Sequence, residues 1–458
     1  MPTQLIVALF VRDMPSRMIR NAAGLVRSPR FAKAITLASL SCAMLMSTAG
    51  AVLAENWPGW RGPRGDGHSA EQQLPTKWSP TENIRWKVPL AGEGHASPVI
   101  WDKHVFIVSC LPDTGARRLT ALDRDSGNTL WERTVVESPL ETKHSLNSYA
   151  SSTPATDGEL VYVTFLESSN QTVVATNVSQ PRDVTLGQVL VAAYDFQGKQ
   201  RWVVRPGQFV SVHGYCSCPV LFENLVILNG DHDGDSYIVA LDKRTGAQIW
   251  KIARDHKTRS YVTPIIRQFA GRTQMIMSGS KSVTSYNPRT GVPIWSMDGP
   301  TEQFVASMVD DGKRVFLTAG YPDRHILAID PTGTGNVTDT HIVWRSKRNC
   351  AYVPSPIVVD NYFLLTSDDG IASCYDSASG ERLWFTRLGN HYSTSPITAA
   401  GLVYFTADNG QTKIIRPGPE LEIMAENEVG EACYASPAAS GNSLFLRTGK
   451  HLLCISKE

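Results

Sequence analysis

A short motif recurs along the chain: ALDRDSGNTLW at Ala121–Trp131 returns almost unchanged as ALDKRTGAQIW at Ala240–Trp250. Looser copies are AYDFQGKQRW from Ala193, SYNPRTGVPIW from Ser285, CYDSASGERLW from Cys374, and a copy from Ala328 whose tryptophan, Trp344, is delayed by an insertion. Glycine supplies the positive φ of a short turn, and the Asp or Asn before it can hydrogen-bond the turn's own backbone. Each copy therefore predicts a β-hairpin, and their number restricts the chain to a repeat fold.

A second block precedes these hairpins. It opens with a small residue, usually Ser or Thr followed by Pro, and continues as two apolar runs separated by a turn, as in SSTPATDGELVYVTF. Proline is tolerated at the first position of a strand, so the block predicts two further strands, and one repeat is four antiparallel strands. Eight such openings occur, at Pro98, Pro154, Pro219, Pro264, Ser307, Pro356, Pro396 and Pro437.

The spacing of the motif tryptophans indicates the fold class. They are 40 to 49 residues apart, except for one step of 71 residues, at Trp86, Trp131, Trp202, Trp250, Trp295, Trp344 and Trp384. Four-stranded units of about 40 to 50 residues are typical of a β-propeller, in which each blade buries its faces against its neighbours. The long step contains the polar segment Glu167 to Gln188, which we expect to be an exposed hairpin extension.

The two ends of the repeat region complement each other. Ile84 to Val88 (IRWKV) is a tryptophan strand without a blade before it, and the last block, ending in CISKE, lacks a tryptophan strand. Pairing them completes a blade and closes the ring, which removes open edge strands. We predict an all-β fold with a single closed eight-bladed propeller over residues 84–458. Seven blades are the alternative, because the unit KIIRPGPELEIMAEN lacks the Trp and Gly pattern.

The N-terminus has the order of regions found in export signals. Basic residues between Arg12 and Lys33 precede the apolar segment Ala34 to Ala54, which ends in Val-Leu-Ala. This order predicts a signal peptide with a basic leader over residues 1–54, cleaved after Ala54, and a periplasmic or cell-envelope location. An uncleaved membrane anchor is the alternative, because the apolar segment is long enough to span a bilayer. Residues 55–83 form a lead segment before the propeller.

Composition restricts the partners and the use of cysteine. A formal net charge of +1, without a basic run beyond the N-terminus, argues against a nucleic-acid surface. Cys374 and Cys454 stand where other copies have alanine, so we expect them to be small core residues. Cys216 and Cys218 share one face of a strand, and we do not expect a bond between them. We expect a monomer.

These motifs carry a family resemblance. From Ile84 onward, the repeat SP…D-G…VY…A-L-D-x-x-T-G-x-x-x-W resembles the pyrroloquinoline-quinone-like (PQQ-like) propeller repeat of quinoprotein alcohol dehydrogenases and of the propeller subunit of the outer-membrane β-barrel assembly machinery. The lead NWPGWRGPRGDGH, from Asn56, is similar to the leader of exported propellers of this type. The resemblance is specific for the fold and not for an activity. It implies that the motif Trp, Asp and Gly mainly dock blades and form turns.

One function that the resemblance implies is a PQQ- and calcium-dependent oxidoreductase. Such enzymes carry a vicinal Cys-Cys disulfide, a tryptophan floor and Glu, Asn and Asp ligands to calcium, whereas the nearest approach to adjacent cysteines here is Cys216 and Cys218. Weak metal candidates are Asp231, Asp233 and Asp235, because their alternation suits a hard cation. A polar β-turn is the other interpretation, since SDDG and ADNG occupy the same turn in other blades.

The other function class is binding without catalysis. Just before each opening strand stands one aromatic or imidazole side chain, and in a propeller these segments converge on the axis. Rings of Tyr with His, Asn and Arg form amphipathic surfaces that bind peptides, sugars or small ligands. The alternative is that each Tyr wedges between adjacent blades. The candidate rim residues, beside Phe304, are His95, Asn147, Tyr149, His213, Tyr215, Arg259, Tyr261, Gln303, Tyr352, Asn390, His391, Tyr392 and Tyr434.

The chain has no Ser/His/Asp order, glycine-rich phosphate loop or paired-carboxylate spacing that points to catalysis. We therefore predict a non-catalytic extracytoplasmic binding or scaffolding propeller that needs no cofactor. Its axial rim would contact an envelope protein or a small ligand, and membrane association would come only through a partner or an uncleaved signal. The PQQ/calcium-dependent oxidoreductase is the alternative.

Overall fold

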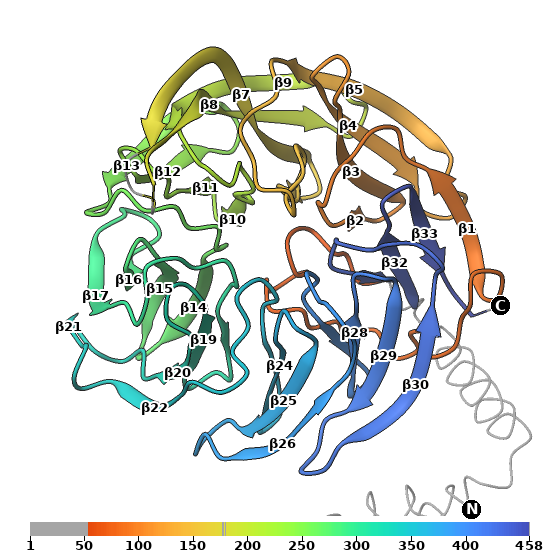
Figure 1. Ribbon diagram of the computed structural model, residues 1–458. Coiled ribbons are helices and arrows are strands. Elements are labelled where there is room, and N and C mark those ends of the chain that lie inside the picture. Colours follow the sequence, from red (N-terminus) through yellow and green to blue (C-terminus); the bar gives the residue numbers. More distant parts are fainter. Residues whose placement is uncertain (1–53, 176–177, 179, 458) are drawn as a thin grey trace, which may run out of the picture. The chain divides into compact units, whose positions relative to one another are not determined.

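The computed structural model describes residues 54–175, 178 and 180–457. These residues form strands, turns and loops, and none of them belongs to a helix that could cross a membrane. The strands are grouped in eight sheets that follow one another around a ring (Figure 1). Of the predicted signal peptide, residues 1–54, all but Ala54 lie outside the described residues, so cleavage after Ala54 stays a prediction.

The first four blades follow the chain. Blade 1 consists of β2 (Val99–Trp101), β3 (His104–Leu111), β4 (Ala116–Asp123) and β5 (Thr129–Glu137). Blade 2 consists of β6 (Ala155–Thr156), β7 (Leu160–Ala175), β8 (Arg182–Asp195) and β9 (Gln200–Phe209). Blade 3 consists of β10 (Val220–Phe222), β11 (Leu225–Gly230), β12 (Tyr237–Asp242) and β13 (Gln248–Ala253). Blade 4 consists of β14 (Ile265–Phe269), β15 (Arg272–Gly279), β16 (Ser282–Tyr286) and β17 (Pro293–Asp298).

The second half repeats this order. Blade 5 consists of β18 (Val309–Asp310), β19 (Val315–Ala319), β20 (His325–Ile329) and β22 (Ile342–Ser346). Blade 6 consists of β23 (Ile357–Val359), β24 (Tyr362–Thr366), β25 (Ile371–Asp376) and β26 (Arg382–Arg387). Blade 7 consists of β27 (Ile397–Ala399), β28 (Leu402–Thr406), β29 (Gln411–Arg416) and β30 (Glu422–Glu428). Blade 8 consists of β31 (Ala438–Ser440), β32 (Ser443–Arg447), β33 (His451–Ile455) and, from the N-terminal side, β1 (Ile84–Pro89).

The ring closes as predicted, with eight blades. β1 pairs antiparallel with β33, and Trp86 lies opposite Cys454. Blade 7 forms although it lacks the motif tryptophan: β29 pairs with β30 and places Ala425 opposite Ile414, at the position where other blades pair a tryptophan with a small residue. Alternating apolar positions are therefore enough to build this blade, and the seven-bladed alternative is wrong.

The motif tryptophans dock each blade against the next. Trp131 lies opposite Ala121 in its own sheet, and its indole Nε1 donates to the carbonyl of Phe196 in the following blade at 2.7 Å. The turn glycine of that following blade, Gly198, has a φ of 77°, and a Cβ there would lie 2.7 Å from the Trp131 ring. The turn thus needs glycine for its backbone conformation and for the close approach of the indole. Trp86, Trp202, Trp250 and Trp344 make the same pair of contacts with the blade that follows each of them.

Two insertions add residues to the regular four-stranded blades. In blade 2, β7 and β8 continue beyond the pair Glu167 and Gln188, so the predicted hairpin extension is present. One face of this extension is buried rather than exposed, because Val184 packs on Val210 and Val212 of the segment that enters blade 3. In blade 5, the insertion before Trp344 contains β21 (Gly335–Asn336), which adds a short parallel fifth strand to the outer edge of β17.

The lead segment crosses the ring along the innermost strands. Trp57 pairs with Ile100 of blade 1, and His68 forms a parallel bridge with Thr398 of blade 7. Between them, the buried guanidinium of Arg61 donates to the carbonyl oxygens of Pro356 and Pro396 at 2.8 and 3.3 Å. These contacts join distant blades and place the WPGWRG sequence across one end of the propeller axis.

Candidate functional site

A cavity of about 460 Å³ lies at the centre of the ring. Every blade contributes lining residues from the segment that leads into its innermost strand, so the cavity coincides with the predicted axial rim. Trp60 of the lead segment also lines it, and the Trp60 indole Nε1 donates to Ser307 Oγ at 3.3 Å. The lead segment contacts the far ends of the innermost strands, so Trp60 forms the end of the cavity opposite the rim. The volume lies within the range of roughly 300 to 1,000 Å³ typical of small-molecule sites.

The structure brings together seven of the candidate rim residues as lining of this cavity. They are His95, Asn147, His213, Tyr261, Tyr352, His391 and Tyr434. They come from blades 1 to 4 and 6 to 8, so the ring is distributed around the axis rather than concentrated on one side. At the junction of blades 8 and 1, the rings of Tyr434 and His95 lie 4.8 Å apart.

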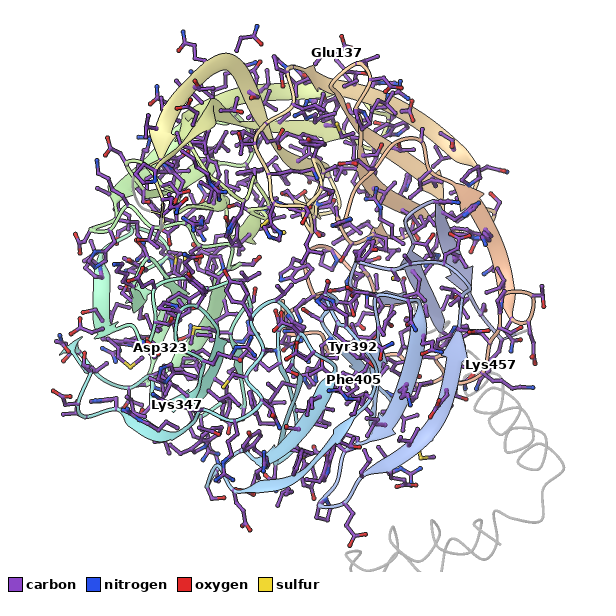
Figure 2. The ribbon with its side chains drawn as sticks, viewed as in Figure 1. Glu137, Asp323, Lys347, Tyr392, Phe405 and Lys457 are labelled. Atoms are coloured by element: carbon purple, nitrogen blue, oxygen red, sulfur yellow. The ribbon has the colours of Figure 1, made fainter. Side chains whose placement is uncertain are left out.

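The other six candidates do not line the cavity. Tyr392 is 1% exposed and packs in an apolar cluster with Phe405, beside which it lies on the inner side of the ring (Figure 2). Tyr215 is likewise buried, with its ring edge-on to Phe209, and Tyr149 packs in the core between blades 1 and 2. Asn390 is exposed outside the cavity. Tyr215 and Tyr392 are therefore buried between blades, as the wedge interpretation predicts, although the Tyr215 hydroxyl has no hydrogen-bond partner among the described residues. Tyr261, Tyr352 and Tyr434 line the cavity, as the rim interpretation requires.

Gln303 and Arg259 lie behind the lining and position it. Tyr352 Oη donates to Gln303 Oε1 at 3.3 Å, which holds the phenol of Tyr352 at the cavity wall. Arg259 donates to Asp233 Oδ1 at 2.7 Å and to His213 Nδ1 at 3.4 Å, which orients the imidazole of His213. Both candidates thus act through a neighbour instead of facing the cavity.

Aspartates in the turn between the second and third strands fix the rim backbone. Asp368 accepts hydrogen bonds from the backbone N–H groups of Tyr352 and Val353 at 2.7 and 3.0 Å. Asp408 does the same for Ser393 in blade 7 and also accepts from His391 Nδ1 at 2.6 Å. These are the SDDG and ADNG turns of the sequence, and their carboxylates hold the cavity wall in place.

Each of the three weak metal candidates pairs with a different Arg or Lys side chain. Asp231 accepts from Arg254 at 3.0 Å, Asp233 from Arg259 at 2.7 Å, and the exposed Asp235 pairs with Lys257 at 2.6 Å. Their carboxylates therefore diverge, and no three His, Cys, Asp or Glu side chains among the described residues gather as a metal-binding group. Of the three, Asp233 belongs to the same rim-fixing position as the aspartates of blades 6 and 7, since it accepts from the N–H of Val212.

Two histidines of the cavity wall, His95 and His213, have pKa values well below the ordinary range. Burial, together with the positive charges of Arg447 and Lys143, lowers the pKa of His95 to about 4. Burial also lowers the pKa of His213 to about 3, with a contribution from Arg259. At neutral pH these imidazoles can each donate one hydrogen bond and accept one without carrying charge.

Hydroxyl groups form a second ring inside the rim, directly before the opening prolines. The N–H of Ser355 donates to Ser395 Oγ at 3.0 Å, and the N–H of Ser395 donates to Ser436 Oγ at 2.8 Å. The same hydrogen bond, from a backbone N–H to the hydroxyl of the next blade, joins Ser97 to Thr153, Thr263 to Ser307, and Ser307 to Ser355. In blade 3 a thiol replaces the hydroxyl, and Cys218 Sγ accepts from Thr153 N–H at 3.3 Å. The repeated Ser/Thr-Pro opening is the sequence signal of this ring.

Sequence reasoning missed several lining residues because they lie outside the two repeated motifs. Trp60 belongs to the lead segment, and Tyr321 and Arg324 belong to a loop within blade 5. Leu146 lies in the connection from blade 1 to blade 2, and its side chain is 58% exposed at the cavity mouth. The turn between the second and third strands recurs in each blade and could have pointed to Tyr321 and Arg324, whereas Trp60 has no counterpart in the repeat.

Comparison with known families gives a sequence match to this fold. A family model described as outer membrane protein assembly factor BamB matches residues 71–185, 168–384 and 323–417. The chain belongs to this family. The matches together run from residue 71 to residue 417, which confirms the PQQ-like repeat resemblance over most of the propeller. Among curated proteins, no sequence matches the chain.

Solved structures with a similar architecture have low sequence identity to this chain. BamB from Moraxella catarrhalis is 14% identical, with a TM-score of 0.56, and the alignment covers 82% of this chain and 98% of that protein. Quinohemoprotein alcohol dehydrogenase from Comamonas testosteroni is 13% identical, with a TM-score of 0.60 and coverage of 88% and 81%. A europium-containing methanol dehydrogenase is 12% identical, with a TM-score of 0.55 and coverage of 86% and 89%. At these identities the likeness shows the fold alone.

Proposed function

We propose that this BamB-family chain is a non-catalytic binding propeller of the cell envelope whose axial cavity receives a ligand or a segment of a partner. The observation that carries this proposal is the cavity itself: it is open at the rim, ends at Trp60, and is lined by aromatic rings, imidazoles and hydroxyl groups from all eight blades. Such amphipathic concave surfaces are typical of binding sites. The basic and apolar N-terminus and the family description as an outer membrane protein assembly factor support export to the envelope.

A photo-cross-linking experiment tests this role in the producing cell. A photoreactive residue at position 146, which is 58% exposed at the cavity mouth, should give an adduct that disappears when Tyr352→Ala is added. The matched control is position 292, where Val292 is 59% exposed in a turn of blade 4 away from the cavity, and it should give none. Equal adducts at both positions, or adducts indifferent to Tyr352, would contradict the proposal.

The alternative function is a PQQ- and calcium-dependent oxidoreductase. It requires oxygen ligands for calcium and cationic partners for the carboxylates of the quinone. Among the described lining residues, Asp368 is the one carboxylate and Arg324 the one guanidinium, and Asp368 already accepts two backbone N–H groups. The nearest cysteines, Cys216 and Cys218, are not adjacent and are both free. These residues do not fit the calcium-bound quinone, so we favour the binding role.

Spectroscopy separates the two functions. The purified full chain is incubated with PQQ and Ca²⁺, and the bound-quinone absorbance is recorded after removal of free cofactor. We expect no stoichiometric quinone on the protein. Stoichiometric binding, together with dye reduction by an alcohol or an aldose, would establish the oxidoreductase instead.

A further inference from the structure

Four serine hydroxyls on one side of the cavity have a proton to donate and no acceptor for it. They are Ser307, Ser355, Ser395 and Ser436, from blades 5 to 8, and each is 4% exposed or less. Each Oγ accepts an N–H from the preceding blade at 2.8 to 3.2 Å. A hydroxyl has one donor proton besides its acceptor lone pairs, and among the described residues these four protons meet no acceptor. An arc of unused O–H donors therefore faces the cavity.

Acceptors face the same space. His391 lines the cavity, and its Nδ1 lies 2.6 Å from Asp408 Oδ2, so in the tautomer that donates this bond Nε2 is left to accept another. The carboxylate of Asp368 accepts two backbone N–H groups and has lone pairs left for a further donor. Burial raises the pKa of Asp368, although the backbone N–H donors and the nearby Arg324 act to lower it. The wall thus offers donors and acceptors within one small volume.

Aromatic rings also line the cavity. Trp60 lies at the inner end of the cavity, and Tyr352 and Tyr434 lie at its rim. The Trp60 indole is held by its hydrogen bond to Ser307 and Tyr434 by its contact with His95, so these rings are already in place before a ligand arrives. Preformed aromatic surfaces bury the apolar face of a ligand at little entropic cost.

We propose that the axial cavity binds a small neutral saccharide, an inference that rests on the proposed binding function and names its ligand. Each sugar hydroxyl both donates and accepts, which matches the serine arc together with His391 and Asp368, which belong to two of the same blades. The C–H face of the sugar ring lies against the aromatic rings. Sulfate only accepts hydrogen bonds, and any inorganic oxyanion would meet the carboxylate of Asp368. An extended peptide presents its carbonyl groups on alternating sides, whereas the donors here lie along one curved wall.

Calorimetric titration of the purified full chain tests the ligand class. The probes are glucose, N-acetylglucosamine, maltose and cellobiose, with inorganic phosphate and sulfate as the competing class. We expect at least one of the four sugars to bind and neither anion to do so. The double variant Ser355→Cys and Ser395→Cys should weaken sugar binding by about tenfold or more, because a thiol is a weak donor. It should still fold, because Cys218 shows that a thiol at this position can accept the backbone N–H of the preceding blade.

The matched control is Ser97→Cys. Ser97 stands at the same position before Pro98 in blade 1 but does not line the cavity, so this variant should bind sugar as the unaltered chain does.

If the double variant unfolds, Tyr434→Ala at the partly exposed rim takes its place and should also weaken binding. Binding of phosphate or sulfate, or of none of the four sugars, would overturn the inference. If sugars fail while the Tyr352-dependent adduct at position 146 persists, the proposed function stands without this ligand. If no sugar binds and no Tyr352-dependent adduct forms, the saccharide inference and the proposed function are both wrong.

Discussion

Trp86 on β1 lies directly opposite Cys454 on β33, which is the pairing of a tryptophan with a small residue that six other blades make within one continuous segment. In blade 8 the two partners come from opposite ends of the propeller sequence. The Trp86 indole also donates to the carbonyl of Arg124 in blade 1 at 2.9 Å. One side chain therefore joins the closing strand to the ring and blade 8 to blade 1.

Removing this closing strand should destabilise the whole propeller. Deletion of Asn56 to Leu90 takes away β1 and the buried Trp57, Trp78 and Trp86, and leaves β33 as an open edge. The single substitution Trp86→Ala should cost about 3 to 5 kcal/mol, as large-to-small core substitutions do. We expect a clearly lower melting temperature for both variants by circular dichroism.

Leu130→Ala serves as the control for this prediction. Leu130 lies on β5, the outer strand of blade 1, and is 47% exposed, so its loss should change the unfolding free energy by roughly 0.5 kcal/mol or less. A truncated chain that melts at the same temperature as the full chain would show that ring closure contributes nothing.

The sequence predicts the ring well because its determinants are local and repeated. Trp131 and its partner Ala121 lie ten residues apart in one hairpin, and the docking glycine, Gly198, occupies a fixed place in the next repeat. Periodic pattern, turn chemistry and packing all point to the same fold. The lead segment has no repeat to align it, so the position of Trp60 at the axis could not be predicted.

The rim was predictable in position but not in side-chain direction. Tyr352 and Tyr392 occupy equivalent sites in blades 6 and 7, yet Tyr352 faces the cavity and Tyr392 is buried against Phe405. The difference depends on which neighbours are in reach: Gln303 of the preceding blade holds the Tyr352 hydroxyl. Such contacts join residues far apart in the chain, so the pattern around each tyrosine does not encode them.

The two tyrosines should therefore behave differently on substitution. Tyr392→Ala removes a fully buried ring and should lower the unfolding free energy by about 3 to 5 kcal/mol, while leaving any ligand affinity of the folded fraction unchanged. Tyr352→Ala should lower stability less and reduce binding at the cavity mouth. Thermal unfolding and ligand titration of the two single variants, compared side by side, check this. Equal destabilisation with equal binding would remove the distinction between wedge and rim.

Glu431 should make ring closure sensitive to acid. Its carboxylate pairs with Lys87 of the closing strand at 2.6 Å, accepts from Thr448 at 2.6 Å, and lies 2.8 Å from Nδ1 of His451 on β33. Burial raises the pKa of this carboxyl, but the bonds from these three partners outweigh it and lower the pKa to about 2. The folded state then binds fewer protons than the unfolded state, whose Glu has its ordinary pKa near 4.5. The stabilisation is complete above about pH 4.5 and is lost as the pH falls toward 2.

Urea unfolding at several pH values tests this linkage. Glu431→Gln should be less stable at neutral pH, by on the order of 1 kcal/mol for a partly exposed cluster, and should lose less stability between pH 4.5 and pH 2. Glu426→Gln is the matched control, because Glu426 pairs with Lys413 in blade 7 but is itself largely exposed. If the unfolding free energy of the unaltered chain and of Glu431→Gln falls by the same amount between pH 4.5 and pH 2, Glu431 does not have this role.

The hydroxyl ring at the axis yields a prediction of opposite sign for two equivalent serines. Ser395 Oγ accepts the N–H of Ser355, so Ser395→Ala leaves a buried donor without a partner and should cost about 1 to 3 kcal/mol. Ser97 Oγ is also buried, but no hydrogen-bond partner for it lies among the described residues. Removing an unpaired hydroxyl ends its desolvation penalty, so Ser97→Ala should be neutral or stabilising. Both serines precede a proline at the opening of a blade, which matches their backbone settings. Denaturant unfolding of the two alanine variants measures the difference directly. If both variants are destabilised by the same amount, the Ser97 hydroxyl also makes a stabilising hydrogen bond in the hydroxyl ring.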